Sequence, residues 1–402
     1  MKAVVFHDIG DIRLENVREP KIQDDFDAIV RLTASAICGT DLHMIRGTLP
    51  GMARGTILGH EGVGVVEQTG RKVRNLEVGD RVVIPSTIAC GTCSYCRSGY
   101  FSQCDQANPN GKDAGTAFFG GPKDSGPFHG LQAEYARIPY ANVGLVKLPE
   151  EVSDDQAILI SDVFPTGYFG ADIAKIHDGS TVAVFGCGPV GQFAIASSFL
   201  MGAARVFAVD AIESRLEMAR KQGAEAIDFG AEDPVEVIRE LTGGIGVDRA
   251  IDAVGVDAVH PERGPAHDKS REKQFKREVE EIAPHANPRG KNWWPGQGPS
   301  QALQWAVEAL AKAGGLSVIG VYPDQMHTFP LGVAMNKNLT LKMGNCNHRK
   351  YIPKLVQLVR THAIDPAEIL TQKEPLLSAI EAYKSFDRRE PGWVKVKLQP
   401  AA

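Results

Sequence analysis

The segment at residues 181–210, TVAVFGCGPVGQFAIASSFLMGAARVFAVD, constrains the fold of this chain more than any other stretch. It opens with Thr181–Phe185, a β-branched apolar run typical of a strand buried in a parallel sheet. The glycine turn GCGPVG follows, then a stretch of helical length, then a second apolar run at 205–209 that ends in an aspartate. A strand, a glycine turn, a helix and a strand in this order predict part of a doubly wound α/β sheet. The glycines and polar residues within the segment argue against a membrane span.

The glycine turn and the acid after it predict a dinucleotide-binding site. Gly186, Gly188 and Gly191 would let the backbone approach a pyrophosphate, and the helix N-terminus would favour its negative charge. Asp210 could accept hydrogen bonds from ribose hydroxyls and would repel a 2'-phosphate, which favours NAD over NADP. Arg215 leaves two alternatives open, because its guanidinium could accommodate such a phosphate or lie on a solvated helix face.

The position of this fingerprint in mid-chain predicts two domains. Strand-like runs at 248–253 and 316–321 extend the alternation of β and α. Ahead of the fingerprint lie short β patterns with glycine and proline turns between them (KAVVF, AIVRLTASAI, GVGVVEQTG and RVVIP), and the tail predicts a helix flanked by strands. We therefore expect a mostly β domain over 1–160, a dinucleotide-binding domain over 161–335 and a return to the first domain over 336–402.

Four cysteines spaced C-x2-C-x2-C-x7-C predict a zinc site: Cys90, Cys93, Cys96 and Cys104. A short knuckle of this kind supplies the four soft ligands that tetrahedral zinc prefers. Two disulfides are the alternative, but the chain has 7 cysteines, an odd number, and its opening residues lack the apolar core of a signal peptide. Since all four ligand positions would be occupied, we expect this zinc to be structural.

Two smaller clusters lie in the β region. Cys38, Thr40 and His43 occur in CGTDLH, and His60 and Glu61 occur in GHE. Alone, such a cysteine is usually a small core residue and such a histidine a hydrogen-bonded structural one. Together they are more informative, because a catalytic zinc needs three protein ligands and an open fourth position. The cysteine and the first histidine of GHE would then need one further partner.

These motifs, in this order and spacing, resemble those of the zinc-dependent medium-chain alcohol dehydrogenases over nearly the whole chain. The resemblance implies an α/β protein with a mostly β, GroES-like catalytic domain carrying a structural zinc lobe, and a Rossmann domain. Classical members have a cysteine ligand where this chain has Asp162, in SDVFPTGYFG. That difference resembles the glutathione-independent formaldehyde dehydrogenase and formaldehyde dismutase branch, and implies Cys38, His60 and Asp162 as catalytic zinc ligands. From the residues alone, Asp162 is equally typical of a helix N-cap.

The resemblance also implies a mechanism and two zinc ions per subunit. Hydride passes from an alcohol or aldehyde hydrate to NAD, and the hydroxyl proton travels through Thr40, a ribose hydroxyl and His43 to solvent. The alternative for Thr40 is a hydroxyl that satisfies nearby backbone. Glu61 is expected beside the metal or as a transient ligand, or else paired with an arginine. The expected cofactor contacts are Thr166, Gly186, Gly188, Pro189, Val190, Gly191, Asp210, Arg215, Val254 and Val321.

An insertion at about 257–300 is too long for an ordinary connection between a strand and a helix. Residues 268–282 have helical composition, and the adjacent Trp293 and Trp294 predict a segment that is ordered by packing. In the formaldehyde branch an insertion here covers the adenine end of NAD. The resemblance therefore implies a cofactor lid, with a subunit contact as the rival interpretation.

Composition excludes several partners. The 402 residues carry a net charge of -5, with 23% charged and 43% hydrophobic residues, so there is no polybasic surface for nucleic acid or anionic lipid. We expect a small-molecule substrate, no nucleic acid and no membrane partner. Cys187 and Cys346 have no partners by spacing and are expected to be reduced in a cytoplasmic protein. A homo-oligomer, tetramer or dimer, follows from the resemblance.

Substrate identity is the least determined feature. Phe101 and Phe164 predict a partly apolar mouth, although Phe101 could instead pack within the cysteine knuckle. An NAD-dependent alcohol or formaldehyde-type dehydrogenase is the first hypothesis. The alternatives are a formaldehyde dismutase with trapped NAD, a polyol or secondary-alcohol dehydrogenase, and a non-catalytic dinucleotide-binding protein.

Overall fold

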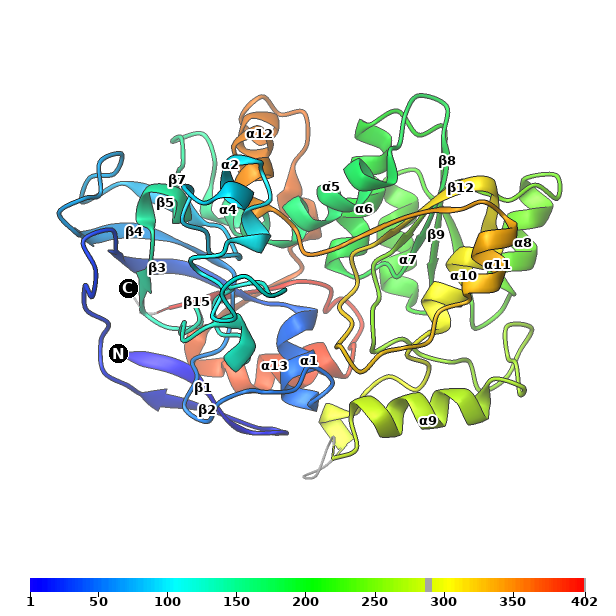
Figure 1. Ribbon diagram of the computed structural model, residues 1–402, viewed down its shortest axis with the longest axis horizontal. Helices are drawn as coiled ribbons and strands as arrows, with labels where there is room; N and C mark the ends of the chain where they lie inside the picture. The colour runs from blue at the N-terminus through cyan, green and yellow to red at the C-terminus, as the bar shows by residue number, and fades with distance from the viewer. Residues whose placement is uncertain (286–290, 401–402) are drawn as a thin grey trace.

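The computed structural model describes residues 1–285 and 291–400. Two sheets form its framework, one of seven strands drawn from both ends of the chain and one of six strands drawn from the middle. Figure 1 shows them side by side, with the blue, cyan and red parts of the chain on the left and the green and yellow parts on the right. A substrate that enters between the sheets would therefore meet residues distant in sequence.

The six-stranded sheet has the strand order of a doubly wound dinucleotide-binding fold. Its strands are β8 (Thr181–Phe185), β9 (Arg205–Asp210), β10 (Glu225–Asp228), β11 (Val247–Asp252), β12 (Leu310–Val318) and β13 (Thr340–Met343). All neighbours are parallel, in the order β10-β9-β8-β11-β12-β13. The order reverses between β8 and β11, and the carboxyl ends of strands at such a switch point open onto a ligand crevice.

Helices cover both faces of this sheet, as its alternating strand residues require. They are α5 (Val163–Ala174), α6 (Pro189–Leu200), α7 (Glu213–Lys221), α8 (Pro234–Leu241), α10 (Gln301–Ala309) and α11 (Leu331–Asn336). On β8, Val182 and Val184 join the core cluster of α5 and α6, whereas Ala183 and Phe185 join that of α8 and α10. The fully apolar pattern of β8 is thus explained by burial on both faces.

The seven-stranded sheet joins the two ends of the chain. Its strands are β3 (Ala28–Ile37), β4 (Gly62–Thr69), β5 (Arg81–Ile84), β6 (Tyr135–Ile138), β7 (Val146–Lys147), β14 (Gln372–Pro375) and β15 (Val396–Gln399). The last of these pairs antiparallel with β3, Val396 opposite Ile37. The predicted return of the tail to the first domain is therefore seen as strand pairing. A hairpin of β1 (Lys2–Asp8) and β2 (Asp11–Asn16) forms a separate sheet.

Further helices lie between and around these strands and carry much of the site. They are α1 (Gly39–Arg46), α2 (Ser94–Arg97), η1 (Phe101–Gln103), η2 (Lys123–Ser125), α3 (Ala141–Gly144), α4 (Asp154–Ser161), α12 (His348–Arg360), η4 (Pro366–Ile369), η5 (Leu376–Ser378) and α13 (Ala379–Asp387). Helix α12 packs against α4 and α5. No helix within the described ranges combines the length and the apolar character that crossing a bilayer requires.

The inserted segment is packed against the rest of the chain at both of its described parts. Helix α9 (Glu272–Ile282) buries Phe275 and Ile282, and η3 (Lys291–Trp293) follows residues 286–290, which lie outside the described residues. Trp293 joins a core cluster with side chains of α1 and α13. Trp294 is 60% exposed, so Trp293 is the tryptophan that packs this segment against the rest of the chain.

Strand β12 differs from its prediction, which was 316–321. It begins at Leu310 and ends at Val318, with an irregularity in its pairing to β11 before Gly315. The two glycines at 314–315 gave the sequence the character of a turn, but the sheet accommodates them as a bulge. After Val318 the backbone amides of Ile319 and Gly320 donate to the Asp252 carbonyl, which turns the chain away. The predicted limits of the domains stay predictions, and β13 lies beyond residue 335.

Candidate active site

A cavity of about 660 Å³ lies between the two sheets. Its wall contains Cys38, Thr40 and His43 from the start of α1, and Gly186 and Val254 from the carboxyl ends of β8 and β11. The cavity thus opens at the switch point of the parallel sheet, where doubly wound folds bind their ligands.

Four side chains able to hold a metal ion converge beside this cavity. The ligand atoms of Cys38, His60, Glu61 and Asp162 all lie within 4.8 Å of one another, and all four residues are buried. Cys38 follows β3, His60 precedes β4, and Asp162 lies at the break between α4 and α5. Three turns of the chain, more than 20 residues apart in sequence, therefore meet at one point.

Neighbouring side chains leave one atom of each predicted ligand free to face the others. Asp41 Oδ1 lies 3.4 Å from Nδ1 of His60, while Nε2 faces Asp162 Oδ2 at 3.7 Å. His348 Nε2 is hydrogen-bonded to Asp162 Oδ1 at 2.7 Å, and Oδ2 lies 3.7 Å from Cys38 Sγ. One sulfur, one nitrogen and one oxygen thus converge. The Asp162 carboxylate makes no capping hydrogen bond, so the N-cap alternative does not explain it.

The electrostatics of this cluster fit a dication. Burial opposes ionisation of Asp162, but hydrogen bonds from His348 and His60 hold its pKa well below the ordinary value. Burial also opposes charge on His60, yet Asp41 and Cys38 raise its pKa well above the usual value. Burial raises the pKa of the Cys38 thiol, so metal binding would displace its proton. A buried site that attracts positive charge and offers S, N and O donors fits zinc with an open position.

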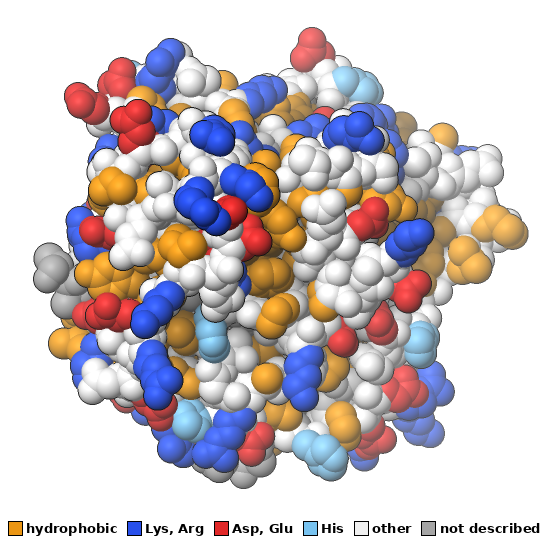
Figure 2. Space-filling view, turned by 60° about the vertical axis from the view of Figure 1, so that its left-hand side comes forward, with side chains coloured by type: hydrophobic (Ala, Val, Ile, Leu, Met, Phe, Trp, Pro, Cys, Tyr) orange, Lys and Arg blue, Asp and Glu red, His pale blue; other side chains and the backbone are white. Residues whose placement is uncertain are grey.

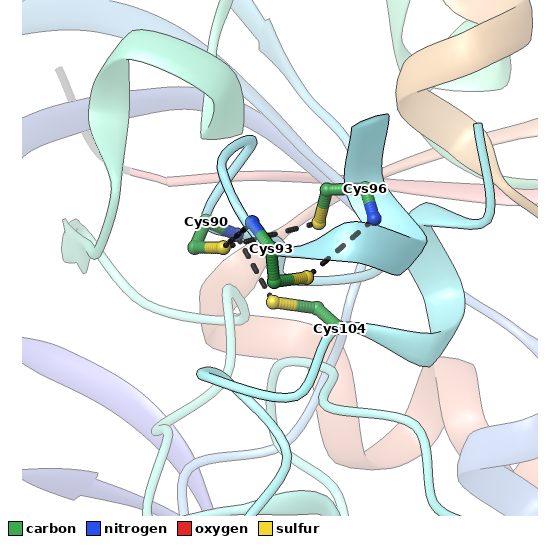
Figure 3. Close-up of side chains that lie close together, drawn as sticks. All are labelled: Cys90, Cys93, Cys96 and Cys104. Carbon is green, nitrogen blue, oxygen red and sulfur yellow. Dashed lines mark hydrogen bonds between the residues drawn. The ribbon is translucent and has the colours of Figure 1, made fainter. Parts of the chain in front are cut away.

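The four predicted knuckle cysteines form a second metal-sized cluster, around α2 and η1 (Figure 3). Cys90, Cys93, Cys96 and Cys104 have their sulfurs within 4.8 Å of one another. The hydrogen bond with Cys96 and the backbone amides of Cys90 and Ala107 lower the pKa of Cys104 to about 5. All seven cysteines lie in the described ranges and are free thiols, so the disulfide alternative is not supported. The donor set fits zinc with no place left for substrate.

The glycine turn has the shape that a dinucleotide requires. Gly186 has φ +87°, a backbone conformation in which any residue with a side chain would be strained. A Cβ on Gly191 would lie 1.8 Å from the Gly186 carbonyl oxygen, so this position also requires glycine. At Gly188 a Cβ would meet nothing nearer than Arg215 Nη1 at 3.9 Å, so this face of the turn is open. Gly188 lines the cavity, and α6 begins at the next residue. A pyrophosphate fits against this open backbone at the helix N-terminus.

Asp210 closes β9 at the edge of the same cavity. Its Oδ2 accepts from the Cys187 amide and its Oδ1 from the Ala211 amide, each at 2.8 Å, which fixes the carboxylate. Arg215 Nη1 lies 3.7 Å from Asp210 Oδ2, and the residue lines the cavity. Arg389 also lines the cavity. Burial, and to a smaller extent the nearby cations Arg215 and Arg46, lower its pKa to about 10. It had no motif to mark it in the sequence.

Some of the other predicted site residues line the cavity, and others lie behind its wall. Glu61 and Gly191 are not wall residues, because Glu61 is turned to Lys395 and Gly191 packs beneath the turn. Thr40 is a wall residue whose Oγ1 lies 3.9 Å from Cys38 Sγ. The remaining predicted contacts on the wall are Thr166, Pro189, Val190, Val254 and Val321.

The apolar mouth is built from other residues than predicted. Phe164 is fully buried and stacks on Phe193 at 4.6 Å between ring centroids, away from the cavity wall. Phe101 packs against the core cluster of the knuckle, which confirms its alternative interpretation. Phe118 and Leu49 line the cavity instead. The aromatic positions next to a motif did not reveal which rings the fold turns toward the substrate.

Comparison with known proteins defines the class. Residues 24–150 match the alcohol dehydrogenase GroES-like domain and residues 189–262 match the zinc-binding dehydrogenase family. An uncharacterized zinc-type alcohol dehydrogenase-like protein of Bacillus subtilis is 38% identical over 404 residues, covering 100% of both chains. The glutathione-independent formaldehyde dehydrogenase of Pseudomonas aeruginosa is 36% identical, covering 97% of this chain and 96% of its own. The structure of alcohol dehydrogenase TADH from Thermus sp. ATN1 matches with a TM-score of 0.81 at 33% identity, covering 100% of both chains.

Fold, paired metal clusters and dinucleotide turn thus define a two-domain, zinc-dependent oxidoreductase with a Rossmann domain and a GroES-like domain. The chain belongs to the zinc-dependent medium-chain alcohol dehydrogenase family. Its cofactors are zinc and a nicotinamide dinucleotide. Both predictions from the sequence, of fold class and of family, are confirmed.

Proposed function

We propose that the protein oxidises a small alcohol or aldehyde hydrate with NAD, and that Cys38, His60 and Asp162 hold the catalytic zinc. The convergence of Sγ, Nε2 and Oδ2 beside the cavity that carries the open glycine turn supports this proposal. A zinc ion there supplies a Lewis acid that favours the ionised form of a hydroxyl near neutral pH. The knuckle cysteines hold a second, structural zinc.

The remaining side chains bind, orient and move a proton. Gly188 admits the pyrophosphate, and Asp210 accepts from the adenosine ribose hydroxyls, which favours NAD over its 2'-phosphorylated form. Thr40 lies 3.9 Å from Cys38 Sγ and passes the substrate hydroxyl proton on toward a ribose hydroxyl. His43, buried at 7% exposure in the same wall, receives that proton and releases it to solvent. Bound NAD would supply the acceptor for the hydride of the substrate carbon.

An assay with a panel of alcohols and aldehydes, with and without added NAD, tests this function. We expect turnover that depends on added NAD. The panel includes formaldehyde because a relative named as a formaldehyde dehydrogenase is 36% identical to this chain. Turnover of aldehyde without added NAD would instead support a dismutase. Inactivity of protein that carries two zinc equivalents would contradict the proposal.

We further propose a homo-oligomer that uses the free edge of the parallel sheet. β13 is the last strand at this edge, and large apolar side chains on it and on α11 are exposed: Leu331 at 70%, Met335 at 68% and Met343 at 63%. Exposed apolar side chains beside the outer edge of a terminal strand favour association with another chain. In contrast, charges of both signs are interspersed over the face in Figure 2. Sedimentation of the wild type and of Met343→Lys tests this, with a smaller species expected for the variant.

A further inference from the structure

The side chain of His43 is bonded to a residue that belongs to the other half of the chain. Its Nδ1 lies 2.5 Å from Oδ2 of Asp257, and both side chains are buried, at 7% and 4% exposure. Asp257 follows β11 at the start of the inserted segment, whereas His43 lies on α1. The insertion therefore reaches across the cavity to a residue on its opposite wall.

Asp257 accepts hydrogen bonds from the end of α1 and from the far end of the insertion. Arg46 Nη1 donates to Oδ2 at 2.8 Å, Thr48 Oγ1 to the same oxygen at 3.3 Å, and the Gly296 amide to Oδ1 at 3.0 Å. A Cβ on Gly296 would lie 2.2 Å from the Asp257 carbonyl carbon, so the two ends of the insertion are in close contact. Burial opposes ionisation, but Arg46 and His43 lower the pKa of Asp257 far below its usual value. The carboxylate is therefore charged across the working pH range.

Among the charged groups near the His43 ring, Asp257 has the strongest electrostatic effect on it. Asp257 faces His43 from the insertion, and Arg46 lies beside this pair on α1. Asp387, the last residue of α13, pairs with Arg46, and Arg389 follows it. The two carboxylates and two guanidinium groups cancel in formal charge. Because Coulomb energy falls with distance, the carboxylate in direct contact with the ring outweighs the rest. Asp257 is thus the charge that acts most directly on the His43 ring.

We propose that Asp257 is a positioning residue for His43, and this inference rests on the proposed function, in which His43 receives the substrate proton. The carboxylate accepts the Nδ1 proton, which leaves Nε2 as the ring atom that can accept a proton from the cavity. The hydroxyl proton moves to Nε2 and then to solvent, the hydride moves to the nicotinamide, and Asp257 itself gains no proton. After the transfer, its negative charge stabilises the imidazolium.

The pH dependence of kcat/KM, measured on the full-length zinc-loaded enzyme, tests this role. Asp257→Asn keeps an acceptor but removes the charge, so the rising limb of the profile should move to lower pH by about one unit. Asp257→Glu keeps the charge and should stay nearer the wild type. Asp387→Asn is the matched control, because it removes the other carboxylate on Arg46 without touching His43, and its limb should not move. An unmoved limb in Asp257→Asn, or an equal shift in Asp387→Asn, would overturn the proposal.

Nitrogen-15 NMR of histidine-labelled protein supplies a readout that needs no turnover. With the signal of His43 assigned from His43→Gln, the wild-type neutral ring should carry its proton on Nδ1, and its titration midpoint should fall in Asp257→Asn. A ring protonated on Nε2 in the wild type would refute the positioning role. Failure of every alcohol and aldehyde to turn over in the wild type would instead refute the proposed function, and the NMR result would still decide the contact.

Discussion

The ammonium group of Lys395 lies 2.6 Å from each carboxylate oxygen of Glu61, and both side chains are wholly buried. Lys395 also donates to the Ile37 carbonyl at 3.1 Å. Burial raises the pKa of Glu61 to about 7, although Lys395 opposes the rise. The pair explains why Glu61 turns away from the cavity wall, and its partner is a lysine from the tail rather than the arginine considered from the sequence.

Removal of the lysine is expected to destabilise the fold strongly. Lys395→Met would leave a buried carboxylate without its cation, which costs about 3–5 kcal/mol. Lys373→Met is the matched control, because its ion pair with Asp155 is 53% exposed on the lysine side and should contribute less than about 1 kcal/mol. Urea denaturation of both variants measures the difference. Equal losses would show that the buried pair has no special weight.

His348 is expected to set the affinity of the catalytic metal. It bonds the Asp162 oxygen that faces away from Cys38, and partners of this kind typically change metal affinity by about 10–100-fold. We therefore expect His348→Ala to lose one zinc equivalent to a competing chelator at a chelator concentration about 10–100-fold lower than the wild type requires. The exposed His327 offers the control variant His327→Ala, which should match the wild type. Unchanged zinc retention in His348→Ala would contradict the role.

The proton path predicts a specific pH dependence for His43→Gln. A glutamine cannot accept the proton, so kcat/KM should fall by about 100-fold near pH 6 and recover toward high pH, where hydroxide can take the proton instead. Steady-state rates between pH 6 and 10 measure this. A loss of the same size at every pH would argue that His43 acts only in packing.

Two glycines of one turn should respond differently to alanine. Gly188→Ala would place a methyl group in the open space over the turn, which should weaken NAD binding with little change in melting temperature. Gly191→Ala would push a methyl group to 1.8 Å from the Gly186 carbonyl oxygen, which should lower the melting temperature itself. Calorimetric titration with NAD and thermal unfolding separate the two effects. Similar melting temperatures for both variants would contradict this geometry.

The knuckle should hold its zinc independently of catalysis. Cys104→Ser removes one of four sulfurs, so we expect one zinc equivalent per chain instead of two and a lower melting temperature. The remaining equivalent should still be lost when Asp162 is replaced by alanine in the same background. Elemental analysis after gel filtration measures both numbers. Retention of two equivalents in Cys104→Ser would place the second metal elsewhere.

Most of the framework could be predicted because it follows local patterns. Strands β3 and β8 match their predicted bounds, since their apolar residues are buried along the whole run. Strands β10 and β13 were missed, because EAID and TLKM are short, partly charged and lie at sheet edges. Their pairing partners, rather than their own composition, make them strands.

For the site, residue type and spacing determined what the chain could bind: four close cysteines for one metal, a glycine turn for a dinucleotide, and Cys38, His60 and Asp162 by family resemblance. The partners that tune these groups were decided only by the tertiary structure. Lys395 lies 334 residues from Glu61, Asp257 lies 214 from His43, and His348 lies 186 from Asp162. A glycine turn or a cysteine knuckle is formed by residues close together in the chain, so its residue types and spacing are visible in the sequence. The long-range contacts arise only when separate elements pack together and bury charged groups, which then need partners.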